Sequence, residues 1–299
     1  MDTTFRKFYR DFYMHTSGFM PSSPLNKNVL PGDFFQIRNG KIMILGNIFR
    51  ENIVDPGDYD LGYRLKLDPS RWVFSNGVSK PGTRLDYHTA AGDFQYNTHV
   101  LAFAAAGSFY FKATDPESVK INNWSYIQQQ LIIKLTQIYY SFREVYLVTE
   151  SATAARWALA ISASDKGELE ITTGTEQVNP SDIFGHPSAK TIQSKDIEYY
   201  HHESRRIPAF FKAKKLVVQD ERMEAFINEF ITKKLYVNEW AQDFFKDDFY
   251  YDATNSYYQA NNAQPALLDM LRANELNPNT ALLYFRWADA NLDDIEKLF

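Results

Sequence analysis

The densest group of residues that could do chemistry is the run His201-His202-Glu203-Ser204-Arg205-Arg206, directly before an apolar stretch that contains lysines. Two histidines bind one zinc ion when they lie one helical turn apart, so that both face the metal. His201 and His202 are adjacent, and adjacent side chains on a strand point to opposite faces. We therefore assign them no catalytic or metal-binding role and favour the polar end of a surface strand.

Other catalytic signatures are missing from the sequence. It contains no GxSxG elbow, no GxxxxGK[ST] phosphate loop and no GxGxxG fingerprint. The aspartates of DPGDYDLG (55–62) lack the terminal glutamate of a calcium loop, so turn chemistry explains them better. The absence of cysteine excludes disulfides, thiolate metal sites and a cysteine nucleophile. We predict no enzyme, no cofactor and no metal, with a hydrolase or transferase site assembled in space as a remaining alternative.

What the stretch does offer is positive charge. Two arginines and three lysines lie close together, and a second basic group lies near the start of the chain: Arg205, Arg206, Lys212, Lys214 and Lys215, then Arg6, Lys7 and Arg10. A solvated sheet face explains such residues without any function. Nucleic acid is disfavoured by a pI near 5.7 and by the lack of a binding motif. An anionic membrane is the remaining target, since each cation near its surface is worth about 1 kcal/mol.

The charge is unevenly distributed along the chain. The net charge is −5, yet residues 221–299 contain 14 acidic and 7 basic residues. The rest of the chain is near neutral and locally basic. A solvated helical surface explains this asymmetry on composition alone, and an acidic tail that docks on a basic body is the alternative.

Several elements follow from hydrophobic spacing. Aromatic residues between Phe5 and Tyr13 recur at helical intervals, which predicts a short amphipathic helix with a basic face. Residues 34–49 predict a hairpin around Asn39-Gly40. Residues 124–140 predict a helix, whose apolar face includes Ile127 and Leu131.

The remaining elements are mostly strands. We predict a strand over 100–113 with Leu101, Phe103, Phe109 and Phe111 on one face, a long hairpin formed by 144–162 and 168–173, and strands over 197–202 and 208–219. Helices are expected from Glu221 onward, including 265–275 and 280–298. The fold class is therefore α+β, a twisted and mainly antiparallel sheet with flanking helices and a helical C-terminal region. The division is 1–220 for the body and 221–299 for the acidic helical region.

Composition and the chain start suggest where the protein works. MDTTFRKFYRDFYMH has no continuous apolar stretch of the kind found in secretory signal peptides, so we expect synthesis in a cytoplasm. Aromatic content is high, at 16%. Aromatic rings fill cores, but they also suit surfaces that meet membranes.

Four segments together resemble the pore-forming domain of gasdermins, most nearly the short bacterial ones. They are LPGDFFQIRNGKIMILGNIF (30–49), VLAFAAAGSFYFKA (100–113) with the following helix, REVYLVTESATAARWALAIS (143–162) and IPAFFKAKKLVVQD (207–220). Bacterial gasdermins typically carry a lipidated cysteine near the start, and this chain has none. The basic aromatic segment Phe5–Tyr13 is the candidate replacement. The tail is also longer than the usual inhibitory segment.

The resemblance implies an autoinhibited pore former, cytoplasmic while inactive and at the membrane once activated. A protease would cut off the C-terminal region, with Tyr257–Pro265 as the candidate linker, and the released bodies would self-associate on anionic lipids as effectors of bacterial cell death and defence. Residues 100–113 and 144–173 alternate as a pore wall requires, although the interior of an ordinary sheet gives the same pattern. The alternative is a protein-binding or regulatory module without catalytic or membrane activity.

Overall fold

The structure is a computed structural model that describes residues 3–88, 94–138, 145–173, 184, 190–222, 225 and 278–299. Strands dominate the described part of the chain. In order the elements are α1 (Thr3–His15), β1 (Met20–Pro21), β2 (Asp33–Arg38), β3 (Lys41–Asn47), β4 (Leu61–Lys66), η1 (Pro69–Trp72), β5 (Val73–Asn76), β6 (Val78–His88), β7 (Phe94–Phe103), β8 (Phe109–Ile121), α2 (Trp124–Ile138), β9 (Tyr146–Ser162), β10 (Glu168–Thr173), β11 (Lys190–Lys195), β12 (Ile197–Glu203), β13 (Phe210–Val218), η2 (Asp220–Arg222), α8 (Pro278–Tyr284), β14 (Phe285–Asp289) and α9 (Leu292–Glu296).

The body is built on one antiparallel sheet of ten strands. Its centre is β9, a strand of 17 residues that pairs with β8, β12, β13 and β2. β3 pairs only with β2, and β14 pairs with β13. Together with the helices that pack on this sheet, the pairing confirms the predicted α+β class and the mainly antiparallel sheet.

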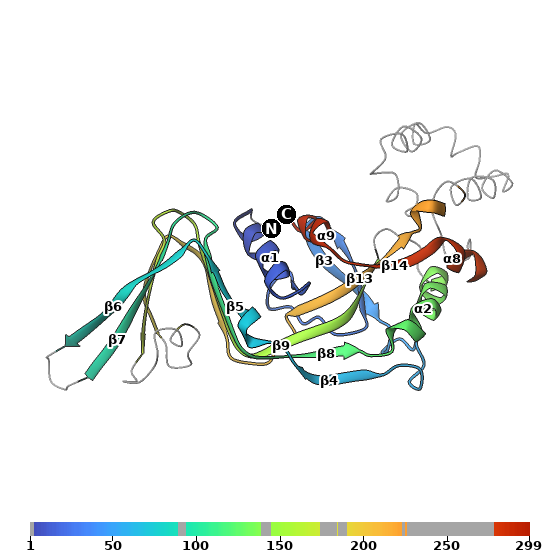
Figure 1. Cartoon of the computed structure of the whole chain (residues 1–299), viewed down its shortest axis with the longest axis horizontal. Coiled ribbons are helices and arrows are strands. Elements are labelled where there is room, and N and C mark those ends of the chain that lie inside the picture. The colour runs from blue at the N-terminus through green and yellow to red at the C-terminus, as the bar shows by residue number, and fades with distance from the viewer. Residues whose placement is uncertain are drawn as a thin grey trace, which may run out of the picture.

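A second sheet of four strands, in the order β11-β10-β7-β6, forms an arm that projects from the body. Figure 1 shows the strands rising from β5, β8 and β9, turning over at an apex and descending toward β6 and β7. Each arm strand is directly continuous with a strand of the body. The arm therefore consists of two hairpin-like extensions of the central sheet.

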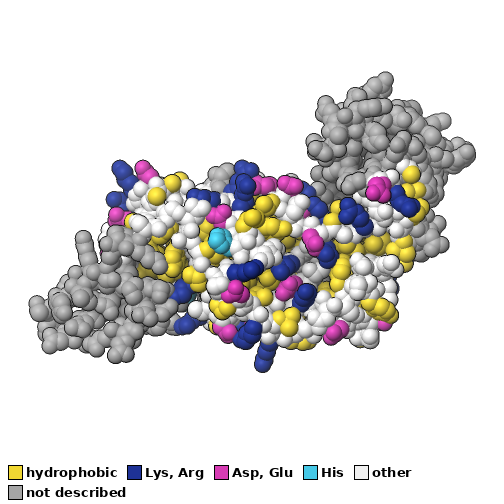
Figure 2. Space-filling view, in the orientation of Figure 1, with side chains coloured by type: hydrophobic (Ala, Val, Ile, Leu, Met, Phe, Trp, Pro, Cys, Tyr) yellow, Lys and Arg dark blue, Asp and Glu magenta, His cyan; other side chains and the backbone are white. Residues whose placement is uncertain are grey.

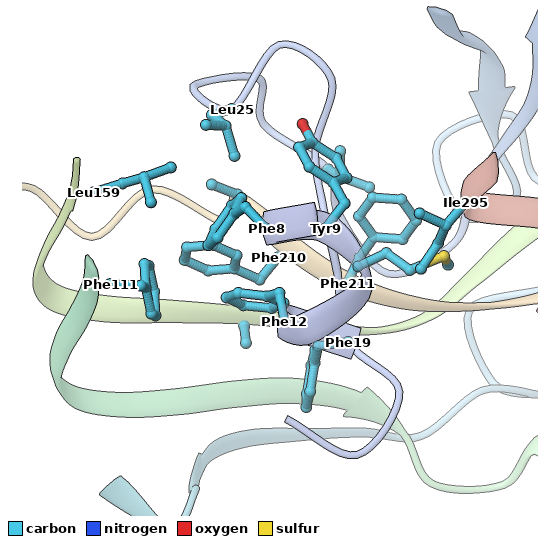
Figure 3. Close-up of a cluster of buried hydrophobic side chains, with 14 of the residues drawn as sticks. Phe8, Tyr9, Phe12, Phe19, Leu25, Phe111, Leu159, Phe210, Phe211 and Ile295 are labelled. Atoms are coloured by element: carbon cyan, nitrogen blue, oxygen red, sulfur yellow. The ribbon is translucent and has the colours of Figure 1, made fainter. Parts of the chain in front are cut away.

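The largest core lies between α1 and the sheet, and Figure 3 shows its centre. Phe8, Tyr9 and Phe12 are fully buried, because positions three and four apart share one helical face. The ring of Phe12 stacks on that of Phe210, with centroids 4.9 Å apart, and meets Trp72 edge to face at 5.4 Å. The predicted helix is confirmed, and its aromatic face packs into the protein while its basic residues face outward.

Two further predictions from spacing are confirmed. The helix α2 buries Ile127, Leu131 and Leu135 in a second core that also contains Leu147 and Leu216. The β2–β3 hairpin turns at Asn39 and Gly40, with φ of 50° and 70°. A turn with both central residues in the left-handed region matches the twist of the flanking strands, which is why Asn-Gly is favoured there.

The predicted strand over 100–113 is wrong in one respect. The chain leaves the ladder between Phe103 and Phe109, so that β7 and β8 belong to different sheets. Leu101 and Phe103 consequently lie in the cluster under the arm, whereas Phe109 and Phe111 lie in the main core. They do not share one face.

The predicted hairpin of 144–162 with 168–173 is also wrong. β9 and β10 do not pair with each other; β10 pairs with β7 and β11. The residues between them redirect the strand from the body into the arm, because the neighbouring strands make the same turn. Turn-forming residues alone do not distinguish a bend from a reversal.

The C-terminal residues correct the predicted helix over 280–298. It is interrupted by β14, whose residues extend the sheet beside β13. The expected helices over 221–258 and 265–275, and the candidate linker Tyr257–Pro265, lie outside the described residues apart from η2 and position 225. The division at residue 220 stays a prediction.

Candidate functional site

The eight cations proposed from the sequence lie on three parts of the body. Arg6, Lys7 and Arg10 are on α1, Arg205 and Arg206 follow β12, and the three lysines are on β13 (Lys212, Lys214 and Lys215). Figure 2 shows basic and acidic side chains interspersed over the visible face of the body. The structure does not gather the eight cations into one open basic patch.

Carboxylates explain this dispersal. Seven of the eight cations form an ion pair with a described residue, the pairs being Arg6 and Arg10 with Glu296, Arg205 with Glu203, Arg206 with Asp115 and Glu117, Lys212 with Glu150, Lys214 with Asp289, and Lys215 with Asp294. Lys7 is exposed and makes no ion pair within the described residues. Most of the proposed membrane-facing charge is therefore neutralised in this conformation.

Three of the acidic partners come from residues 285–299, which we call the C-terminal clamp. Its strand β14 pairs with β13 over five positions, from Lys214 opposite Asp289 to Val218 opposite Phe285. The ammonium of Lys214 lies 2.5 Å from a carboxylate oxygen of Asp289. The clamp thus adds a strand to the body and neutralises a lysine of the strand that it joins.

The end of the clamp reaches α1. In Figure 1 the two termini lie side by side, with α9 against α1. Glu296 lies 2.5 Å from the guanidinium of Arg6 and 3.5 Å from that of Arg10. The ring of Phe299 meets that of Tyr9 edge to face at 5.4 Å, and Ile295 is fully buried. The clamp is held by apolar contact as well as by charge.

Asp294 is the centre of the polar contacts in the clamp. It is fully buried, yet its carboxylate accepts hydrogen bonds from the Lys215 ammonium at 2.9 and 3.0 Å, from the Tyr146 hydroxyl at 2.8 Å and from the Lys297 ammonium at 3.2 Å. The backbone N–H of Asn291 donates a further bond at 2.8 Å, which completes the capping box of α9. A buried charge that is paired and bonded in this way is strongly destabilising to break.

The pKa of Asp294 reflects the same contacts. Burial alone would raise the pKa of this carboxyl group, but the Asn291 N–H, the Lys215 ammonium and the Tyr146 hydroxyl together lower it below its ordinary value of 3.8. Asp294 is therefore charged whenever Lys215 is charged near neutral pH. The ion pair between β13 and the clamp persists across that range.

The remaining cations belong to small local networks. Arg206 and Lys66 both bind Asp115, and these two hydrogen-bonded cations lower the pKa of its carboxyl group. Lys212 lies 3.5 Å from Glu150 and 4.4 Å from the centroid of the Phe19 ring. Exposed pairs of this kind contribute about 0–1 kcal/mol each. They orient side chains more than they stabilise the fold.

Sequence reasoning missed a second basic surface at the end of the β2–β3 hairpin. Arg38 and Lys41 flank the turn, and Met43 and Leu45 are 45% and 37% exposed on β3. Residues 34–50 contain three cations and no acid. Arg38 and Lys41 make no ion pair within the described residues. This hairpin surface is marked in the sequence by its alternation, since Lys41, Met43 and Leu45 fall on the face opposite buried Ile42.

The two histidines that opened the sequence question lie on β12. His201 packs against the rings of Trp157 and Tyr199, at 4.9 and 6.1 Å between centroids, and burial lowers its pKa. Within the part of the chain that the structure describes, no three His, Asp or Glu residues are placed to bind a metal ion. No described helix is both long and apolar enough to cross a bilayer.

Comparison with known proteins gives one structural likeness. A bacterial gasdermin from Bradyrhizobium tropiciagri superposes with a TM-score of 0.27 and 10% sequence identity, over 65% of this chain and 80% of that one. No family model matches the sequence, and no curated protein matches it.

Proposed function

We propose that the protein is an autoinhibited membrane pore former, released by proteolysis in its C-terminal region and acting as an oligomer in bacterial cell death. The observation that carries this proposal is the arm, a pair of hairpins that project from the body. Its strands β6 and β7 have 11 and 10 residues. A strand needs about 9–11 residues to cross the hydrocarbon core of a bilayer.

The hairpin surface is the first point of contact with lipid in this proposal. Arg38 and Lys41 would attract anionic head groups, while Met43 and Leu45 would enter the boundary between head groups and acyl chains. Each cation contributes about 1 kcal/mol near an anionic surface. Because these residues are accessible with the clamp in place, attachment can precede activation.

Release of the clamp would expose more positive charge. Arg6, Arg10, Lys214 and Lys215 lose their acidic partners when residues 285–299 leave the body. The edge of β13 loses its partner strand at the same time. An exposed strand edge is a site for pairing with another chain, which suits self-association.

A charge-reversed clamp tests this proposal without removing any residue. In the clamp variant Asp289, Asp294 and Glu296 are replaced by lysine, so that each faces a cation of the body. The matched control replaces Asp55, Glu198 and Glu221, which are exposed and make no ion pair within the described residues, by lysine. Both variants gain the same net charge, so a general attraction to anionic lipid affects them equally.

We expect the clamp variant to release dye from anionic vesicles and the control to release none. Circular dichroism verifies that both remain folded. Intact vesicles with a folded clamp variant that binds them would refute the proposal. Capture of a specific protein partner, without leakage, would then favour the protein-binding alternative.

A further inference from the structure

Four strands pass from the body into the arm without changing their order. In the body the neighbours run β5-β8-β9-β12, and in the arm they run β6-β7-β10-β11. The continuous strands are therefore β5–β6, β8–β7, β9–β10 and β12–β11. All four turn along one line, at Gly77, at 104–108, at 163–167 and at Asp196.

The two inner strands keep the same register on both sides of this bend. Phe109 lies opposite Ile161 in the body, and Leu101 lies opposite Leu169 in the arm. The step is eight residues along each strand. Hydrogen bonds from Phe103 N to Gly167 O and from Ser162 N to Ser108 O, both 2.9 Å, flank the gap. The inner pair is thus one ladder that is open only at 104–107 and 163–166.

The two outer strands are too short to follow the inner pair across a straight sheet. Asn76 and Val78 lie opposite Phe109 and Phe103, so two residues on the outer strand accompany six on the inner one. On the other side, Ile197 and Lys195 lie opposite Ser162 and Glu168, with the same shortfall of four. The bend absorbs this difference. A slip of four residues would remove it and, being even, would leave every side chain on its own face.

Small side chains make the sharp bend sterically feasible. Gly77 has φ of 67°, and a Cβ there would lie 2.4 Å from Ser108 Oγ. A Cβ on Gly167 would lie 2.1 Å from Ser162 Oγ. Each of these hydroxyl groups accepts a backbone N–H within its own loop, from Ala105 and Ser164, at 3.2 Å. Side chains therefore stabilise the open loops without tying the arm to the body.

Apolar residues from both sheets meet under the bend. Leu101, Phe103, Leu169 and Ile171 of the arm pack with Tyr110, Ala158 and Ala160 of the body, all of them buried. The ring of Phe184 meets that of Tyr110 edge to face at 4.7 Å. These contacts hold the bend closed. Straightening the sheet would turn this buried face outward.

Anchoring in the body decides which half of each outer strand moves. Phe74 of β5 packs against Phe12, and Asn76 donates a 2.7 Å hydrogen bond to Asp11. Tyr199 of β12 packs against Phe5. In the arm, β6 and β11 are the outermost strands of the described sheet. The slip therefore belongs to β6 and β11.

We propose that the line through Gly77, residues 104–108, residues 163–167 and Asp196 is a hinge, and that β6 and β11 each slip by four residues when it opens. The inner strands then form one uninterrupted ladder, from Asn97 opposite Thr173 to Lys120 opposite Glu150. This inference rests on the proposed function, since the straightened arm is the form that presents its apolar face to lipid.

Engineered disulfides test the slip, because the chain has no cysteine of its own. A Cβ at Gly77 lies 3.9 Å from Cβ of Ala104, within the range of about 3.5–4.5 Å that a disulfide requires. After the slip Gly77 lies opposite Ser108, and Ala104 is four residues, about 13 Å, further along. Oxidised Gly77→Cys/Ala104→Cys is therefore locked in the bent register.

The matched control is Gly77→Cys/Ser108→Cys. Its Cβ atoms are 3.2 Å apart in the bent form and directly opposite in the straightened one, so this disulfide permits both after a small local shift. Both variants carry the same strained cysteine at residue 77. Any loss of stability from that strain appears equally in the two.

Hydrogen exchange at 104–107 and 163–166 reads the hinge directly, in the full chain with the charge-reversed clamp and with dodecyl maltoside micelles as the membrane mimic. We expect these amides to gain protection when the proteins are reduced. On oxidation the gain disappears in the locked variant and persists in the control. Equal behaviour of the two oxidised variants, loss of the gain in the control alone, or no gain in either reduced protein overturns the hinge.

Dye release then separates the hinge from the pore. We expect the oxidised locked variant to leave anionic vesicles intact and to release dye on reduction, while the control releases dye in both states. Leakage from the oxidised locked variant at the control's rate overturns the hinge but not the pore. A gain in exchange protection without leakage from any variant supports the hinge and refutes the proposed function.

Discussion

Replacing Asp294 by asparagine removes the charge at the centre of the clamp while keeping the shape of the side chain. The ammonium groups of Lys215 and Lys297 then lose the carboxylate that both contact, at 2.9 and 3.2 Å. Breaking one partner of a buried ion pair costs about 3–5 kcal/mol. We therefore expect Asp294→Asn to lower the free energy of clamp opening by about 3 kcal/mol or more, the lower end of that range, because Lys215 and Lys297 are partly exposed.

Amide hydrogen exchange on β14 measures this opening. Residues 286–289 are protected by the ladder with β13, so their exchange rate reports how often the clamp leaves. A loss of about 3 kcal/mol corresponds to exchange more than a hundredfold faster. Asp293→Asn is the control, because Asp293 lies in the same helical turn but is exposed. Its effect should stay within about 0.5 kcal/mol.

The pH dependence supplies a second check. Because the pKa of Asp294 is lowered in the folded protein, its ion pair stabilises the clamp above the ordinary value of 3.8 and is lost as the pH falls through the lower folded value. Protection of β14 should therefore decline more steeply below about pH 4 in the parent than in Asp294→Asn. Equal protection in Asp294→Asn and Asp293→Asn at neutral pH would refute the reasoning, since the buried charge would then not hold the clamp.

Three further predictions concern the hairpin surface, the main core and the rim of the clamp. Arg38→Gln/Lys41→Gln should weaken binding to anionic vesicles by about 2 kcal/mol, or roughly 30-fold, in a sedimentation assay, and unchanged binding would remove this surface from the account. Phe12→Ala should cost about 3–5 kcal/mol in urea unfolding, against less than about 0.5 kcal/mol for the exposed control Met14→Ala. Lys214→Gln should accelerate exchange on β14 only a few-fold, because its partner Asp289 is 82% exposed; an effect as large as that of Asp294→Asn would contradict the division between rim and buried contacts.

Local patterns in the sequence predicted the elements that depend on local chemistry. The helix α1 follows from the spacing of Phe8 and Phe12, and the β2–β3 hairpin from Asn39-Gly40. In both cases the signal lies within a few residues. The burial of the α1 aromatic face also followed from the same spacing, because an apolar stripe of that width needs an apolar partner.

Features that depend on pairing between distant strands could not be predicted in this way. The bend at 104–108 arises because the outer strand supplies only Gly77 at that level, and no local pattern in residues 100–113 reveals this shortfall. Residues 285–289 form a strand because β13 offers them a free edge. Their sequence suits a helix equally well, so tertiary context decided the outcome.

The candidate site illustrates the same limit. The sequence identified the cations of α1 and β13, but not the acids that neutralise them, because Asp289, Asp294 and Glu296 are more than 70 positions away from Lys214 and Lys215. The hairpin surface was recognisable only after the register placed Met43 and Leu45 on the outer face. Exposure, rather than composition, distinguishes it from the paired cations.

The most direct test of the central claim is dye release from anionic vesicles by the unsubstituted chain before and after cleavage between residues 226 and 277. High salt, which screens the rim ion pairs, followed by gel filtration separates the C-terminal fragment from the body before the vesicles are added. The account predicts no leakage from the full chain and leakage from the separated body, reversed when excess fragment is added back. A folded, separated body that binds vesicles and leaves them intact would contradict it.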